Sequence, residues 1–458
     1  MTDDLHLTDP LTGYIMLGGE REDAVPAVLR DTGTRIELSV PFRDIRTVPG
    51  CWFVSSWRDS NGGLVVGNQI PDSLPHELLF VCNARSFVLV GCRSSGMSMS
   101  VGFGPGTGKV IPTYVVCGGR HGRYAEINGL RTRCLDSVRW FDLSSTSLLV
   151  TKDEEGKCKN VKVCSSAIPP VDIDKQAGLV IRPDFEVTES GKTDSIISRQ
   201  SVLIETKKDC EMKWEEHLSV HHAIKDLISI SDWNSREFTD MSVMRLDDPK
   251  LVIDGKIVYE GWFPVISYYP LVQRNGVDNI QDTFIFSYRD IGIFGIKKWL
   301  SLRQACSQGM TLLSYLAREH QHLALETLSI LVGTALECVA WYVATTERDV
   351  YLFQRNKRNR MLRFVSYEKA LTCVVEKFGS FFPFNDSTRW RFEACKTFMG
   401  NKHPDAKSSD FQTMYQTTMQ SLIILRMWLG IQLGANVAEM KKRLYRDEIG
   451  KNIRDLLI

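Results

Sequence analysis

The pattern of apolar and polar positions divides the chain into two parts of different character. From residue 13 to about residue 141, short runs rich in β-branched and aromatic residues, such as RIELSV, LLFVCN and YVVCGG, alternate with Gly, Pro, Asn and Asp. Short runs between turn-forming residues predict many short strands. Beyond about residue 283, Gly and Pro become rarer and apolar residues recur every three or four positions, which predicts amphipathic helices.

The helical pattern predicts five helices with short connections, as in an up-and-down bundle. They cover residues 304–320, 324–345, 366–378, 387–401 and 411–433. Between the two parts, polar residues 151–193 with the pair Pro169-Pro170 predict an exposed connection or extension, and residues 196–271 mix a helix near 214–230 with strand-like runs. The predicted fold class is α+β. It has a β-rich N-terminal domain over residues 1–150, a mixed α/β extension over 151–284 and an α-helical domain over 285–458.

Composition narrows the class of protein. Over 458 residues, 43% hydrophobic and 24% charged residues are typical of a globular chain, and a net charge of +1 leaves any polyanion site to a local patch. The twelve cysteines form no C-x-x-C pair, so neither zinc nor another cofactor is expected. The acidic N-terminus without an apolar stretch predicts a cytoplasmic protein with reduced thiols. The longest apolar run, 330–344, is too short to cross a bilayer and contains Glu337, so no membrane span is expected.

Two motifs are given a non-catalytic interpretation. GFGPGTGKV at 102–110 has Phe103 where a P-loop needs glycine and Val110 where it needs Ser or Thr, so a glycine-rich hairpin is favoured over a nucleotide site. His217 and His221 share one face of the predicted helix as half of a metal site, but a third ligand is missing. A solvated helix face is therefore favoured.

The densest positive run of the chain allows two interpretations. It consists of Arg355, Lys357, Arg358, Arg360 and Arg363. Such a run is often a solvated loop. It is also suited to phosphate contact with RNA, because guanidinium groups bind phosphate at two points, and the nearby Tyr351 and Phe353 offer rings for unpaired bases.

A histidine with basic neighbours forms the second candidate for chemistry, in the sequence KTFMGNKHPD. Pro404 disfavours helical backbone at His403, so the histidine is expected where the helix ends. RNA cleavage without a metal needs a base for the 2′-OH, a cation for the charged phosphorane and an acid for the leaving oxygen. His403, Lys396, Asn401 and Lys402 supply suitable groups.

Three stretches resemble ApeA-like anti-phage proteins, which join a β-rich N-terminal domain to a C-terminal HEPN domain. They are YVVCGGRHGRYAEINGLRTRCLDSVRWF at 114–141, FSYRDIGIFGIKKWLSL at 286–302, and NKHPDAKSSDF at 401–411 with the later LRMWLGIQLG helix. The resemblance implies a metal-independent endoribonuclease that acts as a homodimer on RNA, with an N-terminal region that detects a phage component or keeps the nuclease silent. It implies His403 as base or acid, Lys396 as charge stabiliser and Asn401 as a hydrogen-bond donor to substrate. Lys402 and the run from Arg355 to Arg363 would contact RNA.

One departure from the family pattern leaves a second hypothesis open. The family carries an arginine separated from the histidine by four to six residues, where this chain has Phe398, Thr397 and Lys396. Lysine keeps the charge but loses the two-point grip on phosphate. The alternative is a catalytically degenerate HEPN protein that dimerises and binds RNA or a protein without cutting.

Overall fold

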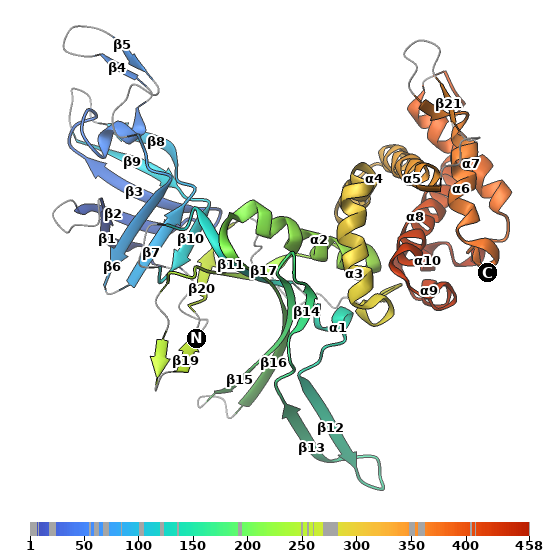
Figure 1. Cartoon of the computed structure of the whole chain (residues 1–458), viewed down its shortest axis with the longest axis horizontal. Coiled ribbons are helices and arrows are strands. Elements are labelled where there is room, and N and C mark those ends of the chain that lie inside the picture. The colour runs from blue at the N-terminus through green and yellow to red at the C-terminus, as the bar shows by residue number, and fades with distance from the viewer. Residues whose placement is uncertain are drawn as a thin grey trace.

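The computed structural model combines a large antiparallel sheet with a helical C-terminal part, which confirms the predicted α+β class (Figure 1). It describes residues 7, 9–17, 24–54, 56–58, 64–66, 73–83, 85–99, 105–119, 123–134, 137–190, 195–248, 251–253, 256–259, 261–268, 283–347, 353–355, 362–403, 405–407 and 409–457.

Fourteen of the described strands form one continuous sheet in the order β14-β15-β16-β11-β17-β20-β10-β7-β6-β1-β2-β3-β9-β8. They are β1 Leu11–Met16, β2 Ala24–Asp31, β3 Ile36–Phe42, β6 Glu77–Cys82, β7 Arg85–Val90, β8 Arg93–Met99, β9 Gly106–Ile111, β10 Tyr114–Cys117, β11 Glu126–Cys134, β14 Val171–Asp174, β15 Leu179–Ser190, β16 Ser195–Lys213, β17 Phe238–Met244 and β20 Phe263–Ile266. Four further pairs form separate two-stranded ribbons: β4 Ser56–Arg58 with β5 Leu64–Val66, β12 Thr146–Lys152 with β13 Cys158–Ser165, β18 Leu251–Ile253 with β19 Lys256–Tyr259, and β21 Phe353–Arg355 with β22 Leu362–Phe364.

The helices follow the predicted periodicity closely in the C-terminal part. They are α1 Ser137–Phe141, α2 Trp214–Asp232, α3 Tyr288–Ala305, α4 Ser307–Glu319, α5 Leu325–Glu347, α6 Tyr367–Glu376, α7 Ser387–Lys402, α8 Phe411–Leu433, α9 Val437–Leu444 and α10 Glu448–Asn452. The sequence pattern did not predict α3, α9 and α10, so the expected number of five C-terminal helices is too low. Within α3, Gly292 has a φ of 56°, so the backbone departs from the helix near its start.

The expectation of an exposed connection over 151–193 is wrong for its second half. Strands β14 and β15 join the main sheet, and their alternating residues Ile173, Leu179 and Ile181 point into the core. Strands from both sides of residue 150 pair directly, as β11 does with β16. The sheet is therefore continuous across this position, and the domain limit there stays a prediction.

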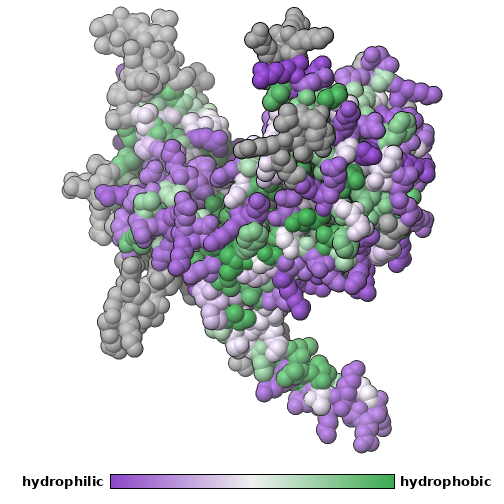
Figure 2. Space-filling model, turned by 45° about the vertical axis from the view of Figure 1, so that its right-hand side comes forward, coloured by the Kyte–Doolittle hydropathy of each residue, from purple (hydrophilic) through white to green (hydrophobic). Residues whose placement is uncertain are grey.

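The first half of that segment forms a projecting arm, the β12-β13 ribbon. Pairing places Leu148 opposite Val163 and Val150 opposite Val161 on one face, and all four side chains are exposed. In Figure 2 the arm projects at the lower right, with green apolar side chains along it and purple polar ones at its tip. Hydroxyls at its base contact Ser198 of β16.

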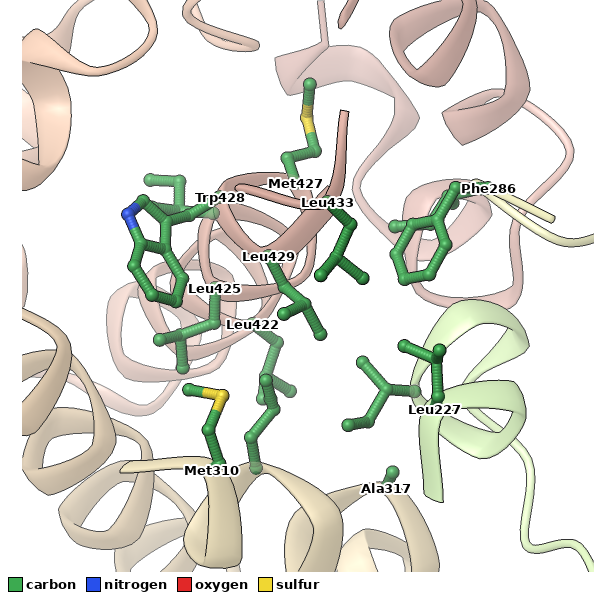
Figure 3. Packing of buried hydrophobic residues seen from close by; sticks show 14 of the residues in the cluster. Leu227, Phe286, Met310, Ala317, Leu422, Leu425, Met427, Trp428, Leu429 and Leu433 are labelled. Atoms are coloured by element: carbon green, nitrogen blue, oxygen red, sulfur yellow. The ribbon is translucent and has the colours of Figure 1, made fainter. Parts of the chain in front are cut away.

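One hydrophobic core joins the sheet to the helical part through α2. Leu227 of α2 faces Met310 and Ala317 of α4 and the apolar side of α8, including Leu425 and Leu429 (Figure 3). The same cluster continues into α5, α6 and α7. This core crosses residue 285, so α2 packs into the same core as the helical part.

Buried charges lock the same junction. Arg426 of α8 donates to both oxygens of Asp447 at 2.8 Å and to the carbonyl oxygens of Ile230 and Ser231 at the end of α2. Asp226 of α2 accepts from Arg303 and Arg318. Buried charges are tolerated when they are paired and hydrogen-bonded in this way, so α2 is held in one position against the bundle.

By length and composition alone, one helix in the described residues, 325–346, is apolar enough to cross a membrane. In the structure it is α5, which packs against α4, α6, α7 and α8. Its hydrophobicity is that of the central helix of a bundle.

Candidate active site at the end of helix α7

Helix α7 presents His403 at its C-terminal end. Asp386 begins the helix, because its side chain accepts hydrogen bonds from the backbone N–H groups of Thr388 and Arg389, both at 2.9 Å. At the other end His403 has extended backbone (φ −122°, ψ 121°), and its N–H donates to the carbonyl of Met399 at 3.0 Å. The side chain is exposed, at the helix end where the following proline predicts it.

Asn401 holds this helix end against its neighbours. Its Nδ2 donates to Ser329 Oγ of α5 at 2.6 Å and contacts Met414 Sδ of α8 at 3.0 Å. Ser329 in turn donates to the carbonyl of Glu326. A carboxamide has two N–H donors, and both are engaged within the protein. Asn401 thus positions His403 and has no unused donor for a substrate in this arrangement.

Lys396 and Lys402 place positive charge around the histidine. Lys396 lies seven residues before His403, close to two helical turns, so both lie on one side of α7 about 10 Å apart along its axis. Lys402 is exposed, and its Nζ lies 4.7 Å from the centre of the Phe398 ring. The ring contact keeps the ammonium group near the helix end.

Two exposed aromatic side chains lie on α7 and at the start of α8. Phe392, one turn before Lys396, is 57% exposed, and Phe411 at the start of α8 is 68% exposed. Large apolar side chains at this level of exposure beside cations mark a surface suited to contact with another molecule.

The basic run lies on a small hairpin, of which Arg355 and Arg363 are described. Lys357, Arg358 and Arg360, together with Tyr351, lie outside the described residues. Phe353 stacks on Phe364 with ring centres 5.2 Å apart, and both rings meet Trp341 of α5 edge-on. Phe353 therefore anchors the hairpin, and it is not the free ring for RNA bases that the sequence suggested.

The hairpin and His403 are attached at different levels of α5. Asn401 contacts Ser329, whereas the hairpin packs on Trp341, twelve residues further along the helix. At 1.5 Å per residue these attachment points are about 18 Å apart along the axis. The structure does not bring the hairpin's attachment next to His403, and only an extended ligand would reach both.

The sequence analysis did not identify the residues of α5 that pack closely against α7. Gly333 of α5 lies against the Phe398 ring, where an added Cβ would come within 2.2 Å of it. A small pocket next to this contact is lined by apolar residues of α5 and α7 and by the hydroxyl-bearing residues Ser329, Tyr367, Thr397, Thr417, Thr418 and Ser421. A lone glycine within the apolar repeat of 324–345 was the available signal for such close helix packing.

The two histidines on α2 are buried, so the expected solvated face is wrong. His217 Nε2 donates to the carbonyl of Ile127 at 3.2 Å, which leaves Nδ1 to accept from Thr206 at 2.8 Å. Thr206 then accepts from His221 Nε2 at 2.9 Å, and His221 Nδ1 accepts from Thr132 at 2.7 Å. Both rings are fully bonded as neutral imidazoles.

Burial also favours the neutral form of both histidines. It lowers the pKa of His217 and holds the pKa of His221 well below its usual value, where His217 and His222 add to the effect. No group of three metal-ligating side chains occurs in the part of the chain that the structure describes. The histidine pair is therefore a structural link between α2 and the sheet and not half of a metal site.

These features define a class of protein: a large antiparallel sheet joined through one buried helix to a helical bundle, with a histidine and two lysines at the end of a bundle helix. A family model described as ApeA N-terminal domain 1 matches residues 10–299, well over half of the chain, and the protein belongs to this family. The matched region includes α2 and ends within α3. No match was found among curated proteins or among solved structures. The match confirms the resemblance to ApeA-like proteins over residues 10–299, and membership of this family indicates a role in anti-phage defence.

Proposed function

We propose that this protein is an endoribonuclease of anti-phage defence that cleaves RNA without a metal ion, and that its helical part is a HEPN bundle acting as a homodimer in the cytoplasm. The observation that carries the proposal is the exposed His403 at the end of α7, with the positive charges of Lys396 and Lys402 beside it. The N-terminal region would respond to a phage component.

The chemistry needs one histidine from each of two copies. A neutral His403 takes the 2′-OH proton while O2′ attacks phosphorus, and the P–O5′ bond breaks. The departing O5′ takes a proton from the protonated histidine of the second copy. Lys396 and Lys402 offset the negative charge that grows on the phosphate oxygens. The products are a 2′,3′-cyclic phosphate and a 5′-hydroxyl end.

Exposed aromatic residues support the assignment of a dimer. A single exposed histidine at the end of α7 supplies either a base or an acid, and a second copy supplies the other. Phe392 of α7 and Phe411 at the start of α8 provide exposed apolar side chains for contact between copies.

A binding module that does not cut RNA is the second candidate. Two observations favour it. Lys396 stands where the family carries arginine, and both amide donors of Asn401 are used inside the protein. In that case the α7 surface and the hairpin of Arg355 and Arg363 would hold RNA or a protein without chemistry.

The experiment is incubation of the purified full chain with total RNA in EDTA, followed by analysis of product ends. Wild type should generate cyclic phosphate ends and leave DNA intact, because DNA lacks the attacking hydroxyl. His403→Ala should be inactive, whereas His76→Ala, which removes another exposed histidine far away in the sheet region, should cleave normally. Intact RNA with retained binding would select the binding module.

A further inference from the structure

The N-terminal sheet has an outer face that the helical part does not cover. Along β3, Ile36, Leu38 and Val40 point into the core, so Glu37 and Ser39 point outward. The register of β1, β2, β9 and β8 continues this outer face across five neighbouring strands. In Figure 1 these strands lie at the end of the molecule opposite the bundle.

One buried carboxylate organises three cations on this face. Glu37 is only 1% exposed, and ion pairs join it to Arg30, to Arg35 at 3.2 Å and to Lys109 at 3.3 Å. Burial alone would raise the pKa of Glu37, but hydrogen bonds from Arg30 and Lys109 bring it below the usual value. One negative charge thus faces three positive ones.

The surplus charge is open to solvent. The side chains of Arg30, Arg35 and Lys109 are 42%, 46% and 43% exposed. Arg93 on the edge strand β8 extends the row, because it pairs with Ile111, two residues from Lys109. Neighbouring strands are about 4.8 Å apart, so the row places cations about 5 to 8 Å from one another.

An exposed aromatic ring shares the same face. Tyr14 alternates with the buried Ile15 on β1 and is 54% exposed. It pairs with Pro26, on the outward side of β2 that also carries Arg30. Proteins that bind single-stranded nucleic acid without reading sequence combine such a ring, on which a base can stack, with cations that follow the backbone.

We propose that this outer face, made by Tyr14, Arg30, Arg35, Lys109 and Arg93, binds single-stranded nucleic acid through its phosphates and one stacked base. This site is separate from α7 and does not depend on the proposed nuclease. Among the described residues, this face has phosphate-binding cations and a ring but no feature that reads a 2′-OH, so DNA and RNA strands should bind equally. It also gives a role to Lys109, the lysine of the glycine-rich segment that is not a P-loop.

The test measures binding of a fluorescent oligothymidylate of about twelve nucleotides to the full chain, between about 50 and 200 mM salt. This probe cannot be cleaved through a 2′-OH, so its binding is independent of the nuclease proposal. Arg93→Gln with Lys109→Gln should weaken binding about tenfold and reduce the slope of log affinity against log salt by about 1.4. The matched control, Lys152→Gln with Lys157→Gln on the arm, removes two exposed cations elsewhere and should change neither.

The aromatic contribution has its own variants. Tyr14→Ala should weaken binding on the order of fivefold or more, whereas Tyr14→Phe should retain it. Removal of Lys109 also removes a partner of Glu37 and could destabilise the protein. The single variant Arg93→Gln avoids this and is measured in the same binding assay. Equal affinity and salt slope in the Arg93 variant and the arm control would overturn the proposal. The proposal would also be overturned if Tyr14→Ala bound the oligonucleotide as tightly as wild type and inorganic tripolyphosphate competed as well as unlabelled oligonucleotide. That result would show a site for free phosphate. His403→Ala should leave this binding unchanged, so failure of the nuclease and failure of this site are distinguishable.

Discussion

The buried histidines of α2 and the exposed His403 of α7 show how the same side chain takes opposite roles in two regions of the molecule. His217 and His221 lie between the sheet and α2, with every ring nitrogen bonded to a threonine or a carbonyl. His403 lies at a helix end in contact with solvent, directly after Lys402 and about two helical turns after Lys396. The sequence favoured a solvated helix face for His217 and His221, whereas the structure buries both rings and makes them structural. The histidine before Pro404 keeps the solvent access that the proposed catalytic role requires.

Replacement of the exposed histidine should have the largest effect. His403→Ala should reduce RNA cleavage by roughly 10³-fold or more, because it removes the proposed acid and base at once. The melting temperature should stay within experimental error of the wild type, since the side chain is exposed. Single-turnover cleavage and thermal unfolding measured on the same preparation check both statements. Full activity in the variant would remove His403 from the site.

Replacement of a buried histidine should do the reverse. His221→Ala should lower the free energy of unfolding by about 3 kcal/mol, because it leaves a cavity and deprives Thr132 and Thr206 of their partner. Urea unfolding measures this loss. At temperatures where the variant is folded, cleavage per molecule should match the wild type. A specific loss of cleavage without a loss of stability would contradict the structural role.

The identity of the cation near His403 sharpens the choice between nuclease and binding module. Lys396→Ala should reduce cleavage roughly 10²-fold, because a donor that stabilises the growing phosphate charge is lost. Lys396→Arg should preserve or raise cleavage through two-point contact. Initial rates on one RNA substrate compare the three proteins. Equal rates in all three would place Lys396 outside the site.

Acid should lower the stability of the fold through the buried histidines of α2. Because the pKa values of His217 and His221 are lowered in the folded state, the unfolded chain binds more protons below about pH 6.5, and stability falls as pH decreases. The fall should reach up to about 1.4 kcal/mol per pH unit for each histidine. His222, whose pKa burial lowers to about 4, acts in the same direction. In the double variant His217→Gln with His221→Gln, the free energy of unfolding should therefore depend less steeply on pH. Urea unfolding at several pH values measures this slope, and an unchanged slope would assign the effect to other groups.

The hairpin should have the smallest effect, because it is attached about 18 Å from the Asn401 contact along α5. Arg355→Gln with Arg363→Gln should weaken RNA binding severalfold and reduce its salt dependence, while cleavage at saturating RNA stays close to the wild type. Titration at two salt concentrations tests this. An unchanged salt slope would make these residues an ordinary solvated ribbon.

The features that the sequence alone could predict are those that depend on residues within a few positions of one another. The apolar repeat marked α5, α6, α7 and α8 to within two residues or so at either end. Pro404 predicted the end of α7, and the mismatched glycine pattern at 102–110 correctly argued against a P-loop, since Gly106–Ile111 is strand β9. Helix ends and turns depend on backbone preferences of neighbouring residues, which the sequence contains directly.

Contacts between distant segments could be decided only by the tertiary structure. Whether His221 is solvated or buried depends on Thr132, 89 residues away, and on β16, which covers it. Burial of Asp226 depends on Arg303 and Arg318 reaching α2 from the bundle. The sequence pattern of α2 is compatible with a solvated or a buried His221, because it does not specify which distant segments pack against the helix. The sequence by itself determined the elements and the exposed end of α7, whereas long-range packing decided which of its charged and titratable groups are structural.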